Sequence, residues 1–266
     1  MLGEDVLLDV TDGVATVTLN QPDKMNALSG EIKDGIGEAL DEIEARDDAR
    51  CVVFEGRGKA FCAGGDVSTM EERQAKGGPS GHDYIQRIIG SCEEIIVRIY
   101  NFELPTIAKI DGYCLGAGVG VAMANDILLA SDRSDFGLVF RNIGLSMDYA
   151  TSVLVTRAVG PYVAKELAFT GRFVPAEDAE EMGLINHAYP TDDFETRADE
   201  FAQEIADGPT VGLHYASRAI DRSHNTTIRE AVEREAMAQN IAKNTRDHEE
   251  GLEAFSEDRD PDFEGL

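Results

Sequence analysis

The stretch KIDGYCLGAGVGVAMAND, residues 109–126, decides the fold of this chain. It begins inside an apolar run (Ile107, Ala108 and Ile110), so it joins a predicted strand, through a turn, to a helix of small residues. The first turn of a helix leaves backbone N–H groups without partners in the helix. Those donors and the positive end of the helix dipole stabilise an anion, either a phosphate or a developing oxyanion. The sequence therefore predicts an anion site at this junction.

A second strand followed by a glycine-rich turn lies earlier in the chain. CVVFEG, residues 51–56, is a short apolar strand of the kind that is buried on both faces. It leads into GRGKAFCAGGDVSTM, residues 56–70, which holds four glycines in fifteen residues. Such a glycine density at the end of a strand indicates backbone that approaches a ligand closely. Repetition of this unit predicts an α/β layered domain.

The remaining elements follow from hydrophobic periodicity and turn residues. Strands 5–10 and 13–19 form a hairpin about Asp12-Gly13, and Ser29 caps a helix that runs to about Arg46. Residues 71–82 are polar and rich in Gly and Pro, which predicts a mobile surface flap. Further helices are predicted at 83–100, from Ala150, at 162–169, from Ala176 and over most of 192–266, and further strands at 106–111, 126–131 and 183–189.

Charge is the unusual property of the composition. The 266 residues include 51 acidic and 24 basic side chains, of which only seven are Lys, and the formal net charge is −27. An acidic, Lys-poor surface is typical of adaptation to high salt, where self-repulsion is screened; an ordinary acidic cytosolic protein is the alternative. Nucleic acid and anionic membranes are excluded as partners by the same field.

The four cysteines (Cys51, Cys62, Cys92 and Cys114) are far apart and have no spacing suited to zinc, so no metal site is predicted. Three of them have apolar or small neighbours in the sequence, which favours buried, inert thiols in a reducing compartment. The N-terminal residues MLGEDVLLDV carry acids and no basic segment, unlike a signal peptide. No apolar run approaches the ~18–20 residues that span a bilayer. We therefore expect a soluble cytoplasmic protein.

Five separated motifs carry a resemblance to a known family. They are NQPDKMNALS (20–29), GRGKAFCAGGDVSTM (56–70), LPTIAKIDGYCLGAG (104–118), AFTGRFVPAEDAEEMGLINHA (168–188) and DHEEGLEAFSEDRDPDF (247–263). In this order they resemble the enoyl-CoA hydratase/isomerase (crotonase) superfamily. The resemblance implies an α/β spiral of strand–strand–helix repeats over residues 1–191 with the acyl-CoA site, and a C-terminal helical region, 192–266, used in trimerisation. It also implies a homotrimer or a hexamer, an acyl-CoA thioester as substrate, and no cofactor beyond the CoA of that thioester.

The resemblance assigns the anion site to the thioester oxygen. Its two backbone N–H donors would be those of Ala63 and Ala117, and Gly116 would keep the approach to the helix open. Each donor of such an oxyanion hole contributes about 3–4 kcal/mol to the barrier. By the same resemblance Lys24 and Ala27 lie along CoA, and its pantetheine channel is lined by Ala63, Gly64, Gly65 and Asp66. The alternative for Lys24 is a solvated loop lysine.

The acid–base residues of hydratases are missing from this chain. Hydratases of the family place two glutamates where this sequence has Gly120 and Phe140. Neither residue can transfer a proton, and general acid–base help normally supplies ~10²–10⁴-fold in rate, so hydration is disfavoured. The segment NIGLSMDYATS, residues 142–152, is similar to enoyl-CoA isomerases of the phenylacetate-pathway type, in which one Asp moves the proton. Asp148 is therefore the predicted proton shuttle of a double-bond isomerisation.

Three hypotheses remain open from the sequence. Around Asp148 the chain departs from the family pattern: Met147 stands where the family usually has Pro, and Tyr149 and Ala150 stand where it has a glycine pair. Asp148 is therefore either catalytic or a cap of the helix that starts near Ala150. The chain is then an isomerase, a crotonase-fold enzyme of another reaction (hydratase, decarboxylase or thioesterase), or a catalytically silent CoA-binding member. A silent RNA-binding member is disfavoured because the net charge is −27.

Overall fold

The computed structural model describes residues 3–78 and 80–266. Strands that are far apart in sequence form a six-stranded sheet in the order β1-β2-β3-β5-β7-β10. The strands are β1 (Val6–Thr11), β2 (Val14–Leu19), β3 (Cys51–Gly56), β5 (Thr106–Ile110), β7 (Ile127–Ser131) and β10 (His187–Tyr189). The pair β1/β2 is antiparallel and forms the predicted hairpin, whereas all later pairs in this sheet are parallel.

A second, four-stranded sheet has the order β4-β6-β8-β9. Its strands are β4 (Ala60–Cys62), β6 (Tyr113–Leu115), β8 (Asp135–Gly137) and β9 (Phe173–Pro175). Each of β3, β5 and β7 is followed after a short turn by a strand of this small sheet, and then by helical structure. The strand–strand–helix repeat expected from the resemblance is therefore confirmed. Sequence reasoning did not find the small sheet, because three-residue strands are too short to show an alternating pattern.

Fifteen helical segments surround and extend the sheets in the part of the chain that is described. They are η1 (Pro22–Lys24), α1 (Gly30–Glu44), α2 (Val67–Ala75), α3 (Gly81–Cys92), η2 (Glu93–Val97, a π-helical turn), α4 (Arg98–Tyr100), α5 (Ala117–Met123), η3 (Val139–Ile143), α6 (Thr151–Thr170), α7 (Ala176–Glu181), α8 (Thr191–Ala206), α9 (Thr210–Arg222), η4 (Ser223–Asn225), α10 (Ile228–Ala242) and α11 (Arg246–Glu257).

The large sheet is covered on both faces along β3, which explains why residues Cys51 to Phe54 of this strand are apolar. Val52 and Phe54 point into the main core, together with Ile32, Ile36 and Leu40 of α1. The alternate residues Cys51 and Val53 pack on the other face against Phe194, Ala198 and Ala202 of α8. Since successive side chains of a strand point to opposite faces, a stretch that is covered on both sides favours apolar residues at every position. Helix α8 thus completes the core, although it lies beyond residue 191.

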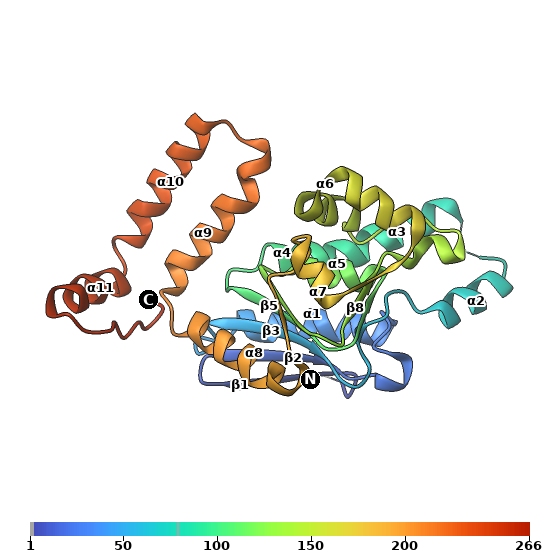
Figure 1. The fold of residues 1–266 in the computed structure, drawn as a ribbon, viewed down its shortest axis with the longest axis horizontal. Coiled ribbons are helices and arrows are strands. Elements are labelled where there is room, and N and C mark those ends of the chain that lie inside the picture. The colour runs from blue at the N-terminus through green and yellow to red at the C-terminus, as the bar shows by residue number, and fades with distance from the viewer. Residues whose placement is uncertain (1–2, 79) are drawn as a thin grey trace.

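The last helices form an arm that extends away from the two sheets (Figure 1). Helix α10 has no buried residue, and large apolar side chains on it are exposed, among them Ile228, Val232 and Met237. The backbone leaves the core at Gly208-Pro209, where the sequence predicts a helix break. Of the C-terminal helical region predicted at 192–266, α8 thus packs on the core, whereas α9, α10 and α11 form the arm.

The prediction of a mobile surface flap at residues 71–82 is wrong for most of these residues. Helix α2 covers residues 67–75, and α3 begins at Gly81, which leaves only a short connection that includes Pro79, a residue outside the described part. The helices form because Asp66 caps α2, accepting from the N–H of Thr69 (3.2 Å), while Ser80 caps α3 through the N–H of Asp83 (3.2 Å). Two caps outweigh the low helix propensity of the glycines between them.

One further boundary differs from that predicted, and one predicted helix break is confirmed. The strand expected at 183–189 spans only His187–Tyr189, because Gly183 adopts a positive φ of 76° and starts a turn. The helices predicted from Ala150 and at 162–169 are both present: they are the two parts of α6, separated where Gly160 has a non-helical φ of 76° and ψ of 166°. The kink precedes Pro161, which disfavours helical geometry in the residue before it.

Candidate active site

A cleft of about 260 Å³ collects residues from most of the predicted motifs. It is bordered by the loop after β4, helices α2 and α3, the start of α5, and the segment from η3 to Tyr149. Of the residues predicted from sequence, the cleft is lined by Ala63, Gly65, Asp66, Gly116, Ala117, Phe140 and Asp148. Lys24, Ala27 and Gly64 do not line it. Segments separated by more than 80 residues in sequence thus meet at one site.

Gly64 and Gly118 bring the two glycine-rich motifs together backbone to backbone. Gly64 has φ +87°, and a Cβ atom there would lie 2.7 Å from the carbonyl oxygen of Leu115. A Cβ atom on Gly118 would lie 2.2 Å from the carbonyl oxygen of Cys62. Both distances are too short for any side chain. These glycines are therefore required by the contact between the loop and the start of α5.

The start of α5 offers the backbone donor that the sequence predicts. Ala117 is the first residue of the helix, and the preceding Gly116 (φ 54°, ψ −123°) provides no side-chain cap. Among the described residues, no acceptor is found for the N–H of Ala117. A helix N-terminus with a free N–H on the wall of a cleft can bind a developing negative charge.

Ala63 does not provide the second donor in this structure. Its N–H donates to the carbonyl oxygen of Met25 at 3.0 Å, so Ala63 lines the cleft with this group already engaged. Two residues further on, Gly65 also lines the cleft, and within the described chain its N–H has no acceptor. Gly65 pairs with Leu28 in an isolated parallel bridge. The N–H of Leu28 donates to the carbonyl oxygen of the neighbouring Gly64 (2.7 Å), so this bond does not use the N–H of Gly65. Gly65 therefore offers a free N–H donor of this loop to the cleft.

Asp148 has a carboxylate that is partly buried and unpartnered. Its Oδ1 is inaccessible to solvent and has no hydrogen-bond partner among the described residues. Burial raises the pKa of this carboxyl from 3.8 to about 6. The carboxyl is therefore ionised at pH 7, but its pKa lies close enough to 7 for the group to accept and return a proton.

The structure does not support the alternative role of Asp148 as a helix cap. Helix α6 begins at Thr151 after Ala150, and no side chain caps it. Thr151 instead donates, through its N–H (3.1 Å) and its Oγ1 (2.7 Å), to the main-chain carbonyl of Asp148. The Asp148 carboxylate is therefore left free to face the cleft.

Tyr149 and Ala150 hold a conformation that side chains rarely adopt. Their φ angles are 48° and 57°, in the left-handed region where the family usually has two glycines. Tyr149 is 6% exposed, and its hydroxyl shares a hydrogen bond with Ser91 of α3. Such strain costs of order 1–2 kcal/mol per residue and persists only where the surroundings impose it. Here the burial of Tyr149 fixes the segment that carries Asp148.

One of the two positions where hydratases carry a glutamate is closed to any side chain, and the other holds a phenylalanine. A Cβ atom on Gly120 would lie 2.3 Å from the carbonyl oxygen of Tyr149, so no side chain fits there. Phe140 is buried in the cleft wall. The other acid of the cleft is Asp66, whose pKa is lowered to about 2 by hydrogen bonds from Ser68 and Thr69. Among the described cleft residues, only Asp148 is therefore a carboxyl that titrates near neutral pH.

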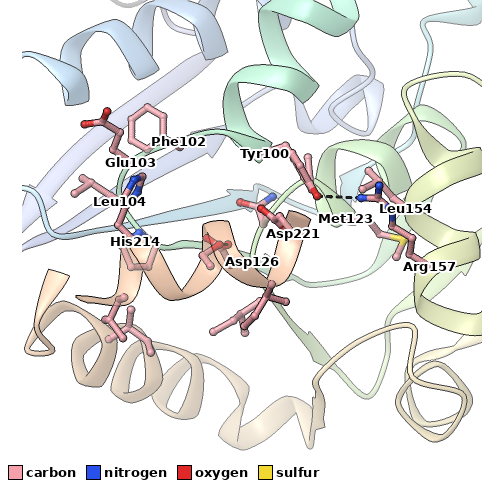
Figure 2. Close-up of a pocket in the computed structure, with 18 of the residues that line it drawn as sticks. Tyr100, Phe102, Glu103, Leu104, Met123, Asp126, Leu154, Arg157, His214 and Asp221 are labelled. Atoms are coloured by element: carbon pink, nitrogen blue, oxygen red, sulfur yellow. Dashed lines mark hydrogen bonds between the residues drawn. The ribbon is translucent and has the colours of Figure 1, made fainter. Parts of the chain in front are cut away.

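A larger cavity of about 540 Å³ lies between α9 and the core, and Figure 2 shows its lining. It contains none of the site residues predicted from sequence. Two of its carboxylates are hydrogen-bonded, Asp126 by Ser217 (2.5 Å) and Asp221 by Tyr100, and Tyr100 also accepts from Arg157 (3.0 Å, dashed in Figure 2). Among its described lining residues, no buried carboxylate oxygen lacks a partner. We therefore place the chemistry in the smaller cleft.

The fold and this cleft define a crotonase-type protein, and comparison with known proteins agrees. The sequence model of the family described as enoyl-CoA hydratase/isomerase matches residues 9–266. The 1,2-epoxyphenylacetyl-CoA isomerase of Escherichia coli (strain K12) is 30% identical over 98% of this chain and 99% of its own. The mitochondrial enoyl-CoA hydratase domain-containing protein 2 of Mus musculus is 34% identical over 95% of this chain and 85% of its own.

Solved structures show the same fold. The crystal structure of an enoyl-CoA hydratase from Mycobacterium smegmatis matches with a TM-score of 0.88 and 29% identity, covering 97% of this chain and 98% of the other. The chain therefore belongs to the enoyl-CoA hydratase/isomerase family.

Other expectations from the sequence concern thiols, metals and membranes. All four cysteines are free, and Cys51, Cys62 and Cys114 are buried, as predicted; burial raises the pKa of Cys62 to about 12. Among the described residues, no group of three or more His, Cys, Asp or Glu side chains could hold a metal ion. No helix in the described ranges has the length and apolar character needed to cross a membrane.

Proposed function

We propose that the protein is an enoyl-CoA isomerase that moves a carbon–carbon double bond by a 1,3-proton shift. The observation that carries the proposal is the unpartnered carboxylate on the cleft wall, Asp148, whose buried Oδ1 has no hydrogen-bond partner among the described residues. One base and an oxyanion site are sufficient for a proton shift. Addition of water needs a second proton-transfer group, and Gly120 leaves no room for one.

In the proposed reaction the thioester carbonyl oxygen accepts hydrogen bonds from the N–H groups of Gly65 and Ala117. Asp148 removes a proton from the carbon next to the carbonyl, and the electron pair moves onto the oxygen, which forms the dienolate. The two donors stabilise this charge by about 3–4 kcal/mol each. The same carboxyl then returns the proton at the far end of the conjugated system. No further cofactor is needed, since CoA enters as part of the substrate.

We propose that CoA reaches the cleft along the residues that the family resemblance indicates. Asp66 and Gly65 line the cleft, Gly64 holds their loop against Leu115, and Ala27 is buried behind it. Lys24 lies near Asp66, whose pKa its charge helps to lower. This position at the mouth of the cleft suits a cation that meets the phosphates of CoA.

We also propose that the arm of α9, α10 and α11 joins copies of the chain into a homotrimer or a dimer of trimers. The exposed apolar side chains of α10 support an interface on the arm. The four free thiols fit a cytoplasmic location. Light scattering on the purified protein measures the assembly; a monomer would contradict it.

The proposed reaction is tested with 3-enoyl-CoA and 2-enoyl-CoA substrates, offered to the wild type and to Asp148→Asn in high salt. We expect isomerisation by the wild type and its loss in the variant. Hydration of 2-enoyl-CoA that persists in the variant would overturn the proposal. CoA binding without turnover of either substrate would identify a silent CoA-binding member.

The oxyanion donor is tested by Ala117→Pro. Proline is well tolerated at the first position of a helix, and it removes the N–H while leaving the chain otherwise helical. We expect kcat to fall about 10²–10³-fold, as for the loss of one oxyanion donor. A thermal melt and a CoA-binding titration serve as controls, because a merely misfolded variant would lose these as well.

A further inference from the structure

The turn formed by residues 148–150, which carries the proposed base, is held by two neighbouring residues at the end of α3. The hydroxyl of Tyr149 shares a hydrogen bond with Ser91. Burial raises the pKa of the Cys92 thiol, and a hydrogen bond from the main chain of Tyr149 to this thiol acts in the opposite direction. Ser91 and Tyr149 both line the cleft. Helix α3 therefore contacts the turn through both the side chain and the backbone of one residue.

Helices α5 and α6 hold the same turn. A Cβ atom on Gly120 of α5 would lie 2.9 Å from the Cβ atom of Tyr149 and 2.3 Å from its carbonyl oxygen. Thr151, the first residue of α6, donates from its Oγ1 to the main-chain carbonyl of Asp148 at 2.7 Å. Tyr149 itself is buried in the main core. Contacts with three helices thus fix a turn of three residues.

The direction of the Asp148 carboxylate depends on the backbone of this turn. Its Oδ1 has no hydrogen-bond partner among the described residues, and the carboxyl accepts a hydrogen bond from its own main chain. Tyr149 and Ala150 have φ angles of 48° and 57°, which residues with a Cβ atom keep only where the surroundings impose them. A turn that lost its support would relax toward ordinary φ angles and rotate the carboxylate.

The end of α3 that supports the turn is itself anchored. Helix α3 has no buried residue, whereas Ile95 and Ile96 of η2, directly after it, are buried in the main core. Segment η2 is a π-helical turn, a feature that is frequent at functional sites. Ser91 and Cys92 lie at the junction of α3 with η2. Because this junction is fixed to the core, it can hold Tyr149 in place.

We propose that Tyr149 is a positioning residue: anchored by Ser91 and Cys92, it fixes the direction of the Asp148 carboxylate toward the substrate. The inference rests on the proposed function, because it takes Asp148 as the base. A single base that moves a proton between two carbons must stay within reach of both, and small misplacements of such a group are costly. In this role Tyr149 acts through Asp148 and does not itself transfer the proton.

Tyr149→Phe and Ser91→Ala remove the two partners of one hydrogen bond. With a 3-enoyl-CoA substrate we expect each variant to lower kcat about 3- to 10-fold and to change KM less than about twofold. The double variant should lose no more than the larger single loss, since both changes remove the same bond. Ser91→Thr keeps the hydroxyl and should retain most of the wild-type kcat. Tyr162→Phe, which removes the same atom from an exposed tyrosine of α6, should change neither constant.

Three kinetic outcomes would overturn the inference. Losses that multiply in the double variant would show that the two hydroxyls act independently. A wild-type kcat in both single variants would show that the bond does not direct Asp148. A loss of about 10²-fold or more in Tyr149→Phe, with Ser91→Ala near the wild type, would make the tyrosine hydroxyl an acid of the reaction and not a positioning group.

Hydrogen exchange measured without substrate separates this inference from the proposed reaction. In Tyr149→Phe and in Ser91→Ala, amide exchange in a peptide covering residues 148–154 should rise about tenfold, as for loss of one hydrogen bond. Exchange in α8 should stay unchanged. If the wild type isomerises no 3-enoyl-CoA but exchange rises in this way, the proposed reaction fails and the support of Asp148 by Tyr149 stands. Unchanged exchange in both variants would overturn the inference, whether or not the enzyme isomerises.

Discussion

Asp148 and Lys109 are two charged side chains withdrawn from solvent, and the protein treats them in opposite ways. Lys109, in β5, is 7% exposed and lies within 4.0 Å of three carboxylates: Glu195 (2.5 Å), Asp199 (2.8 Å) and Glu55 (3.6 Å). Burial acts to lower its pKa, but hydrogen bonds to Asp199 and Glu195 outweigh this and raise it. Asp148 has a buried oxygen with no partner, and its pKa moves toward neutrality.

The difference separates a charge that holds the fold from a charge available for chemistry. The carboxylates around Lys109 tie α8 to the large sheet, so the ammonium is neutralised where it lies. Because the chain is rich in acidic residues, several carboxylates are available to neutralise this one ammonium. A cation beside Asp148 would lower its pKa and make it a weaker base. The unpaired state of Asp148 is therefore destabilising and is suited to proton transfer.

The largest expected effect is that of Asp148→Asn. The variant should lose about 10²–10⁴-fold in isomerisation rate, because the proton has no acceptor. It should also gain up to about 2 kcal/mol in unfolding free energy at pH 7, since a destabilised buried charge is removed. Enzyme assays and urea unfolding measure the two effects. If the variant is active and less stable than the wild type, Asp148 is a charge that holds the fold, like Lys109, and not a charge available for chemistry.

Gly120→Ala should have the next largest effect. Its Cβ atom would lie 2.3 Å from the carbonyl of Tyr149, so the segment that carries Asp148 must shift. We expect kcat/KM to fall about 10–100-fold, because small misplacements of a catalytic group are costly, and stability to fall by about 2–3 kcal/mol from overpacking. Gly90→Ala is the control, since a Cβ atom on Gly90 meets nothing within 4 Å. Unchanged activity in Gly120→Ala would show that the position of Asp148 is not fixed by this contact.

Lys109→Met tests the structural half of the comparison. Removing the ammonium leaves three carboxylates in mutual repulsion, of which Glu55 is the least exposed. We expect a loss of about 2 kcal/mol in unfolding free energy, less than for a fully buried pair because Glu195 and Asp199 can rehydrate. The loss should shrink in high salt, while kcat of the folded enzyme stays unchanged. A large fall in kcat would mean that this cluster also serves the active site.

The pH dependence gives a smaller, graded effect. Asp148 acts as a base only when ionised, and its pKa is about 6, so kcat/KM should level off above pH 6 and fall about tenfold by pH 5. The contribution of Asp148 to the free energy of unfolding changes with pH in the opposite direction. The folded pKa lies above the ordinary value of 3.8, so the contribution of Asp148 to stability is fully present below about pH 4 and is lost as pH rises through 6. Asp148→Asn should remove this part of the stability profile; an unchanged profile would show that other groups produce it.

Asp199→Asn should have the smallest effect. Its side chain is 69% exposed, and Glu195 remains beside the ammonium of Lys109 at 2.5 Å. We therefore expect less than about 1 kcal/mol in unfolding free energy, the range of exposed ion pairs. Chemical denaturation beside Lys109→Met measures it. A loss as large as that of Lys109→Met would mean that Asp199 alone balances the buried charge.

The candidate site was predictable from sequence in part. The position of Ala117 at a helix start follows from an apolar strand, a turn and small residues, and the structure confirms that helix start. The choice between Ala63 and Gly65 could not be made, since both lie in one glycine-rich loop and their N–H directions depend on the carbonyl of Met25, which comes from a distant segment.

By itself the sequence determined the α/β class, the large sheet with its hairpin, the glycine-rich turns and the absence of glutamates at positions 120 and 140. These features depend on local conformational preference and on periodic burial, which a single chain segment expresses. Only the tertiary structure decided that Asp148 does not cap α6, that Gly65 carries the free N–H and that no side chain fits at Gly120. Each of these depends on an atom from another part of the chain, and the position of that atom is fixed only when the whole core is packed.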